Sequence, residues 1–109
     1  MIELPVAHAE GRFVAATPED LTRIQDNGRA VLRYVNASGD AVSYPENPNG
    51  SMNAIAGICD TTGQVLGIMP HPERYLQHWQ HPRWTRSERR GAGDGLDLFK
   101  TGVRVMKGV

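Results

Sequence analysis

The sequence has a single cysteine, no long apolar run and no net charge, and each shortage excludes a class of protein. One cysteine, Cys59, rules out an intrachain disulfide framework and favours a reducing compartment. No apolar stretch approaches the roughly 18 residues that a membrane-spanning helix requires. Basic and acidic residues are equal in number, 12 of each, so the overall charge gives no reason to expect a nucleic acid or a membrane as partner.

Length and the first residues set further limits. A chain of 109 residues suffices for one small domain, which buries roughly two thirds of its unfolded surface. The opening residues Met-Ile-Glu lack the basic start of a secretory signal, and no long apolar segment follows them. We therefore expect a cytoplasmic protein.

The stretch most informative about chemistry is residues 69–74, which read Met-Pro-His-Pro-Glu-Arg after an apolar run at residues 65–69. Each proline biases the residue before it toward extended backbone, so the chain should stay extended through His71. Because residues i and i+2 then face the same side, His71 and Glu73 are predicted to project together. A carboxylate that holds an imidazole in one tautomer is the base-and-orienter half of a nucleophilic triad. The alternative is an ordinary loop histidine beside a capping or solubilising glutamate.

Hydrophobic periodicity predicts an α/β fold around this stretch. Apolar runs at residues 55–59 and 65–69 are predicted to be strands buried on both faces and joined by a hairpin loop. A third strand is expected at residues 29–35. Thr17 is the predicted N-cap of a short surface helix. Residues 95–107 should form a second helix, whose apolar stripe is expected to pack on one face of the sheet.

Two polar segments carry side chains that suit a binding site. In residues 5–12, His8 and Glu10 repeat the i, i+2 spacing of the later His–Glu pair. In residues 45–51, two prolines and an Asn-Gly pair predict an ordered turn whose backbone groups suit a ligand. Solvated loop residues and a plain turn are the respective alternatives.

Residues 79–93 combine four arginines with two tryptophans, a composition that suits single-stranded nucleic acid or a plain surface loop. The neutral overall charge favours the surface loop. A zinc site formed by His71, His78 and His81 lacks a cysteine or nearby acid to complete its ligands, so no metal is expected.

Three of these segments, in this order, resemble the C-terminal part of class I (triad) glutamine amidotransferases. The narrower resemblance is to the glutaminase subunit or domain of phosphoribosylformylglycinamidine synthase. It rests on residues 5–12, on residues 47–51 with the strand after them, and on residues 69–74. The family has glycine where this chain has Ala9.

The resemblance implies a flavodoxin-like α/β fold, with a mixed sheet that includes an antiparallel hairpin and with a C-terminal helix. It implies that His71 and Glu73 are catalytic. A second set of residues is expected to lie beside the site or to bind substrate: His8, Glu10, Arg12, Asn49 and Gly50.

The family places its nucleophile on a Gly-x-Cys-x-Gly elbow upstream of the His-Pro-Glu stretch. Cys59 lacks this pattern and is predicted to be a buried core thiol. Residues 1–109 are therefore predicted to be the C-terminal portion of an amidotransferase domain, without the half that carries the elbow.

The function implied is hydrolysis of L-glutamine to supply ammonia for purine biosynthesis. The expected partners are the synthetase subunit and the missing N-terminal half of the domain. ATP and magnesium would bind the synthetase, and no cofactor is expected in this chain. One alternative is a catalytically inactive truncated or interaction module of the same fold. Another is a different triad amidotransferase, against which the segments at residues 5–12 and 47–51 argue.

Overall fold

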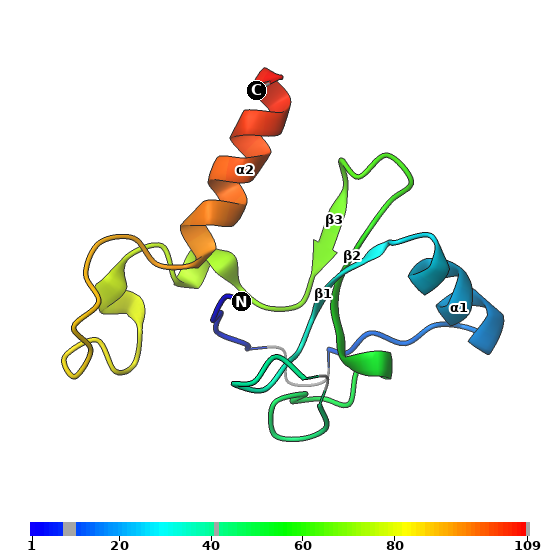
Figure 1. Cartoon of the computed structure of the whole chain (residues 1–109), viewed down its shortest axis with the longest axis horizontal. Helices are drawn as coiled ribbons and strands as arrows, with labels where there is room; N and C mark the ends of the chain where they lie inside the picture. Colours follow the sequence, from blue (N-terminus) through cyan, green and yellow to red (C-terminus); the bar gives the residue numbers. More distant parts are fainter. Residues whose placement is uncertain (8–10, 41, 109) are drawn as a thin grey trace. The chain divides into compact units, whose positions relative to one another are not determined.

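The computed structural model describes residues 1–7, 11–40 and 42–108, which divide into two compact units (Figure 1). We call His8–Met69 the strand unit, because it holds all the strands of the sheet. We call Met1–Ala7 with Pro70–Val109 the terminal unit. No helix among the described residues is both long and apolar enough to cross a membrane.

The strand unit is built on a three-stranded sheet in the order β1-β2-β3, formed by Ala30–Arg33, Ile55–Cys59 and Leu66–Ile68 (Figure 1). Both pairings are antiparallel, with Gly57 opposite Ile68. The predicted antiparallel hairpin is therefore confirmed, whereas the described strands include no parallel pair of the predicted mixed sheet. A parallel pair needs a long crossover, usually a helix, whereas β2 and β3 are joined by a short hairpin loop.

Burial differs across this sheet. The central strand β2 is covered, and Ile55 at its start is fully buried. At the edge, Leu66 of β3 is 45% exposed, so the prediction that both apolar runs are buried on two faces fails for β3. The small core consists of Tyr34, Ala54 and Ala56, and the burial of Tyr34 raises the pKa of its hydroxyl.

Local signals place the remaining elements of the strand unit. Helix α1, Pro18–Asp26, begins after Thr17, whose hydroxyl accepts a hydrogen bond from the Asp20 N–H at 3.1 Å. No residue of α1 is buried, which confirms a surface helix. In the β2–β3 loop, the Asp60 carboxylate accepts hydrogen bonds from the Thr62 hydroxyl and the Val65 N–H, and these lower its pKa.

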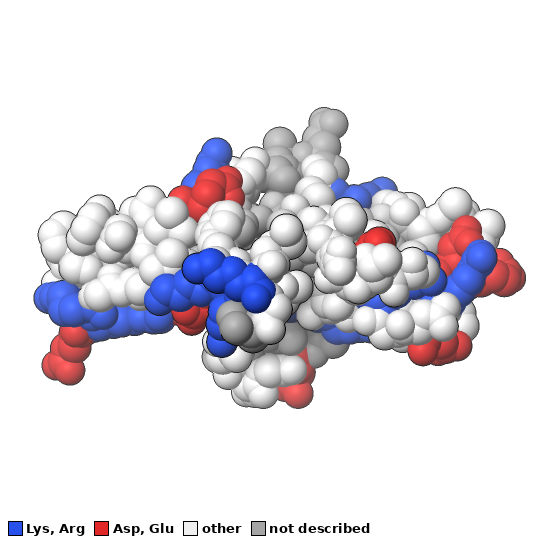
Figure 2. All heavy atoms as spheres, turned by 90° about the horizontal axis from the view of Figure 1, so that it is seen from above, with Lys and Arg blue, Asp and Glu red and all other residues white. Residues whose placement is uncertain are grey.

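The terminal unit contains the 3-10 turns η2, Pro72–Arg74, and η3, His78–Gln80, followed by the helix α2, Gly95–Lys107. Helix α2 has the predicted bounds and packs against η2. On its apolar stripe, the side chains of Phe99, Val103 and Met106 are 47%, 53% and 86% exposed. The packing of this stripe on a face of the sheet stays a prediction. Figure 2 shows Lys and Arg atoms gathered over the loop between η3 and α2, with acidic atoms beside them.

Candidate active site

His71 and Glu73 lie together at the start of η2. The His71 Nδ1 and Glu73 Oε1 atoms are 2.6 Å apart, which confirms that the two side chains project toward each other. The backbone reaches this arrangement through a turn rather than through the expected extended segment. His71 is the N-cap of η2, and its carbonyl accepts a hydrogen bond from the Arg74 N–H at 3.1 Å. On the other side, the His71 N–H donates to the Pro5 carbonyl at 2.8 Å.

This contact determines which nitrogen of the His71 imidazole carries the proton. An ionised carboxylate only accepts hydrogen bonds, so Nδ1 carries the proton and, in the neutral ring, Nε2 keeps its lone pair. Nε2 makes no hydrogen bond to any of the described residues. The hydrogen bond from His71 is the main reason that the pKa of Glu73 lies below its ordinary value. The His71 side chain is 30% exposed and therefore accessible to a substrate.

Two glycines hold the turn that carries this pair. A Cβ atom on Gly95 would lie 1.9 Å from the Pro72 carbonyl oxygen, and one on Gly93 would lie 2.3 Å from the Tyr75 carbonyl oxygen. Both glycines are buried, and the Gly95 N–H donates to the Tyr75 carbonyl at 2.9 Å. The backbone before α2 therefore touches the backbone of η2. Sequence reasoning missed this contact, and its only signal was the Gly-Ala-Gly-Asp-Gly run at residues 91–95.

Asp94, which lies between these glycines, bonds to two segments that are distant from each other in the sequence. Its carboxylate accepts a hydrogen bond from the Glu3 N–H at 2.8 Å and forms an ion pair with Arg89. Burial by itself would raise the pKa of Asp94, but the hydrogen bonds from Arg89 and Glu3 outweigh it and the pKa is lowered. The carboxylate is thus charged in the folded protein at neutral pH.

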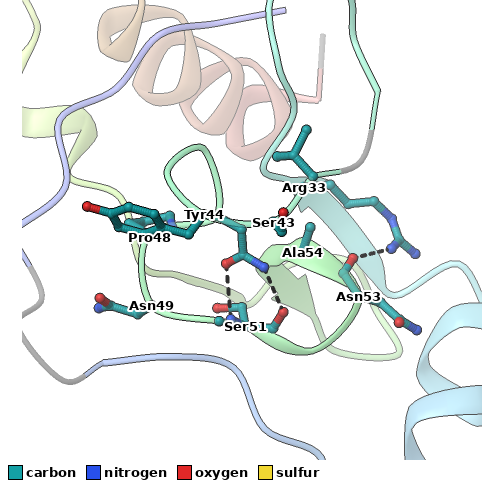
Figure 3. Close-up of a pocket in the computed structure, with 11 residues that line it drawn as sticks. Arg33, Ser43, Tyr44, Pro48, Asn49, Ser51, Asn53 and Ala54 are labelled. Carbon is teal, nitrogen blue, oxygen red and sulfur yellow. Dashed lines mark hydrogen bonds between the residues drawn. The ribbon is translucent and has the colours of Figure 1, made fainter.

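The strand unit contains the second candidate region, the predicted turn before β2 (Figure 3). The Asn47 amide accepts from the Ser51 N–H and donates to the Ser51 carbonyl, both at 3.0 Å, and both residues are buried. The Ser51 hydroxyl in turn accepts from the Phe13 N–H at 3.1 Å. Gly50 has a φ of +68°, which favours glycine. These bonds confirm an ordered turn.

A cavity of about 730 Å³ opens beside this turn (Figure 3). Arg33 reaches across its edge to donate to the Asn53 carbonyl at 2.7 Å. Arg12 comes close to Gly50, since a Cβ on that glycine would lie 3.9 Å from the Arg12 Nη1 atom. Asn49 donates to the Gly11 carbonyl at 2.9 Å. The other lining residues include Val42, Ser43, Tyr44 and Pro48.

The predicted site residues thus fall into two groups. Arg12, Asn49 and Gly50 lie together in the strand unit, whereas the His71 and Glu73 pair belongs to the terminal unit. His8 and Glu10 lie outside the described residues.

The remaining candidate ligands and nucleophile do not form a site. Cys59, at the end of β2, is a free thiol that is partly buried rather than fully buried as predicted. In the described ranges, no three His, Cys, Asp or Glu side chains are grouped to hold a metal ion. His81 instead bonds through Nε2 to the Glu3 carboxylate at 2.9 Å.

Residues 1–106 match the family of the CobB/CobQ-like glutamine amidotransferase domain. The chain is 44% identical over 110 residues to phosphoribosylformylglycinamidine synthase subunit PurQ of Archaeoglobus fulgidus, covering 98% of this chain and 39% of that protein. It is 47% identical over 105 residues to PurQ of Thermomicrobium roseum, covering 96% and 39%. For PurQ of Trichormus variabilis the identity is 46% over 100 residues, covering 92% and 36%. The chain therefore spans less than half the length of these curated relatives.

Proposed function

The chain belongs to the CobB/CobQ-like glutamine amidotransferase family, and we propose that it is the C-terminal part of a glutaminase that supplies ammonia to a phosphoribosylformylglycinamidine synthase. The observation that carries this proposal is the 2.6 Å contact between His71 Nδ1 and Glu73 Oε1, on a histidine side chain that is 30% exposed. The similarity to three PurQ subunits supports the choice of synthase. We propose that the glutaminase domain is flavodoxin-like and that the protein acts in the cytoplasm.

In the proposed reaction, His71 moves protons at Nε2. A cysteine thiol from outside these 109 residues gives its proton to Nε2, and the resulting thiolate attacks the side-chain amide carbon of glutamine. The tetrahedral intermediate collapses, the C–N bond breaks, and the proton on Nε2 passes to the departing ammonia. Water then loses a proton to Nε2 and cleaves the thioester, which releases glutamate and restores the thiol.

Glu73 orients the ring in every step and offsets the positive charge that the imidazole gains. Its lowered pKa supports this role, because the carboxylate must be ionised while His71 is protonated. No group in this mechanism requires a metal or an organic cofactor. ATP and magnesium are assigned to the synthetase partner.

The turn around Asn49 and Gly50 is proposed to border the glutamine site, together with Arg12, His8 and Glu10. A guanidinium suits a carboxylate, which glutamine carries at its backbone end. The bond of Asn49 to Gly11 joins the turn to the segment that holds Arg12. This role is separate from proton transfer.

A second candidate function is a non-enzymatic module of the same fold. Ammonia release from glutamine separates the two candidates. The chain alone should show none above background, and the chain joined to the elbow-bearing half of a family domain and to the synthetase should show turnover. Absence of turnover in that folded assembly would favour the non-enzymatic module.

A further inference from the structure

The terminal unit contains a cavity of about 530 Å³ that the glutaminase reaction does not use. Its walls come from η3, from the loop after it, and from Tyr75. Three guanidinium groups line it, those of Arg83, Arg86 and Arg89, and this is the loop over which Figure 2 shows basic atoms gathered.

The charge of this cavity is only partly balanced. Arg89 is paired with Asp94 and lies over the Tyr75 ring, 5.7 Å from its centroid. Glu3, the acid on the wall, is paired with a histidine. Within the described part of the chain, the exposed side chains of Arg83 and Arg86 form no ion pair. Among the described residues, these two guanidinium groups on one wall therefore have no counterion.

An imidazole and an indole, those of His78 and Trp84, also line the cavity. The His78 Nδ1 atom is buried and has no hydrogen-bond partner among the described residues. Trp84 flanks the same histidine, with 6.1 Å between the ring centroids and an angle of 70°. An indole at a cavity wall offers a stacking surface to a planar ring.

We propose that this cavity binds a small phosphate ester that carries a planar ring, a compound of the nucleotide class. The forked guanidinium groups of Arg83 and Arg86 suit the oxygen atoms of a phosphate, with which arginine forms bidentate, charge-assisted hydrogen bonds. A cavity of this volume lies within the range of small-molecule sites, and it leaves room for the ring beside Trp84. The site is independent of the proposed glutaminase function.

The test is a titration of the full chain with inorganic phosphate and with adenosine 5′-monophosphate, followed by tryptophan fluorescence. The Trp79→Phe variant leaves Trp84 as the sole tryptophan, so its signal reports on the cavity. The mononucleotide should bind more tightly than phosphate and should quench this signal. The Arg83→Gln/Arg86→Gln variant should bind the mononucleotide about 100-fold more weakly, about tenfold for each charge-assisted hydrogen bond that the double substitution removes.

The matched control is Arg104→Gln, which removes an exposed arginine on α2 away from the cavity and should leave binding unchanged. Arg83→Lys keeps the positive charge but loses the forked guanidinium, so its affinity for the mononucleotide should lie between those of the wild type and Arg83→Gln. Three results would overturn the proposal: no saturable quenching by the mononucleotide, equal weakening by the control, or tighter binding of an oligonucleotide. Circular dichroism establishes that each variant is folded.

Discussion

The contact between Gly95 and Pro72 predicts the effect of an alanine at Gly95 on stability. A steric clash should destabilise the variant, whereas the higher helix propensity of alanine should stabilise it. A Cβ at Gly95 would lie 1.9 Å from the Pro72 carbonyl oxygen, well inside contact distance, and the nearest atoms belong to backbone. The turn or the helix must then shift. Overpacking of this kind costs about 1–3 kcal/mol of unfolding free energy. Alanine in place of glycine in a helix stabilises by about 0.5–1 kcal/mol, which only partly offsets that cost.

Gly102 provides the matched control, because it lies on the same helix and a Cβ there would meet nothing within 4 Å. Gly102→Ala should therefore raise the melting temperature, whereas Gly95→Ala should lower it by about 4–8 °C for each kcal/mol of destabilisation. In the completed enzyme, Gly95→Ala should also reduce glutamine hydrolysis by up to about 10²-fold, since the shifted turn carries His71 and Glu73. Circular dichroism melts and ammonia release measure the two effects. Equal melting temperatures for the two variants would refute this account of the turn.

Three further predictions concern the strand unit. Because the pKa of Asp60 is lowered, the ionised carboxylate stabilises the fold at neutral pH, and this stabilisation is lost as the pH falls below about 4. Asp60→Asn should remove this part of the pH dependence of the urea midpoint. A variant whose urea midpoint falls with acid as steeply as that of the wild type would contradict the prediction. Cys59→Ser should lower the melting temperature but leave turnover of the completed enzyme largely intact, and loss of turnover without a change in melting would identify Cys59 as the nucleophile. Asn47→Ala should lower the free energy of unfolding, measured with urea, by about 1–3 kcal/mol, because the backbone N–H and carbonyl of Ser51 lose their hydrogen-bond partner. A stability equal to that of the wild type would show that the turn does not need the Asn47 side chain.

Local chemistry made several features predictable from the sequence. The cap of α1 at Thr17 and the bounds of α2 follow from side chains within a few residues of each helix end. The pairing of His71 with Glu73 was also predictable, since the two residues lie close together along the chain. The backbone that brings them together was not, because the turn is held by distant segments, at Pro5 and at Gly95.

Features that depend on distant parts of the chain were predicted less well. The sheet is antiparallel throughout its described strands, and strand direction depends on how the connections return rather than on the apolar pattern of each strand. The stripe of α2 is strongly apolar and yet exposed. A helix stripe shows that a partner is needed but does not identify it. The chain spans less than half the length of the curated relatives that it matches.

The most direct test of the central claim is ammonia release from glutamine by the completed enzyme carrying His71→Ala, at saturating glutamine. General acid–base groups contribute about 10²–10⁴ in rate, so the decrease should reach or exceed this range. Glu73→Gln should cost less, because its amide oxygen still accepts the hydrogen bond from Nδ1 but cannot offset the imidazolium charge. If a folded His71→Ala enzyme kept more than about a tenth of the wild-type rate, well outside that range, His71 would not be the base.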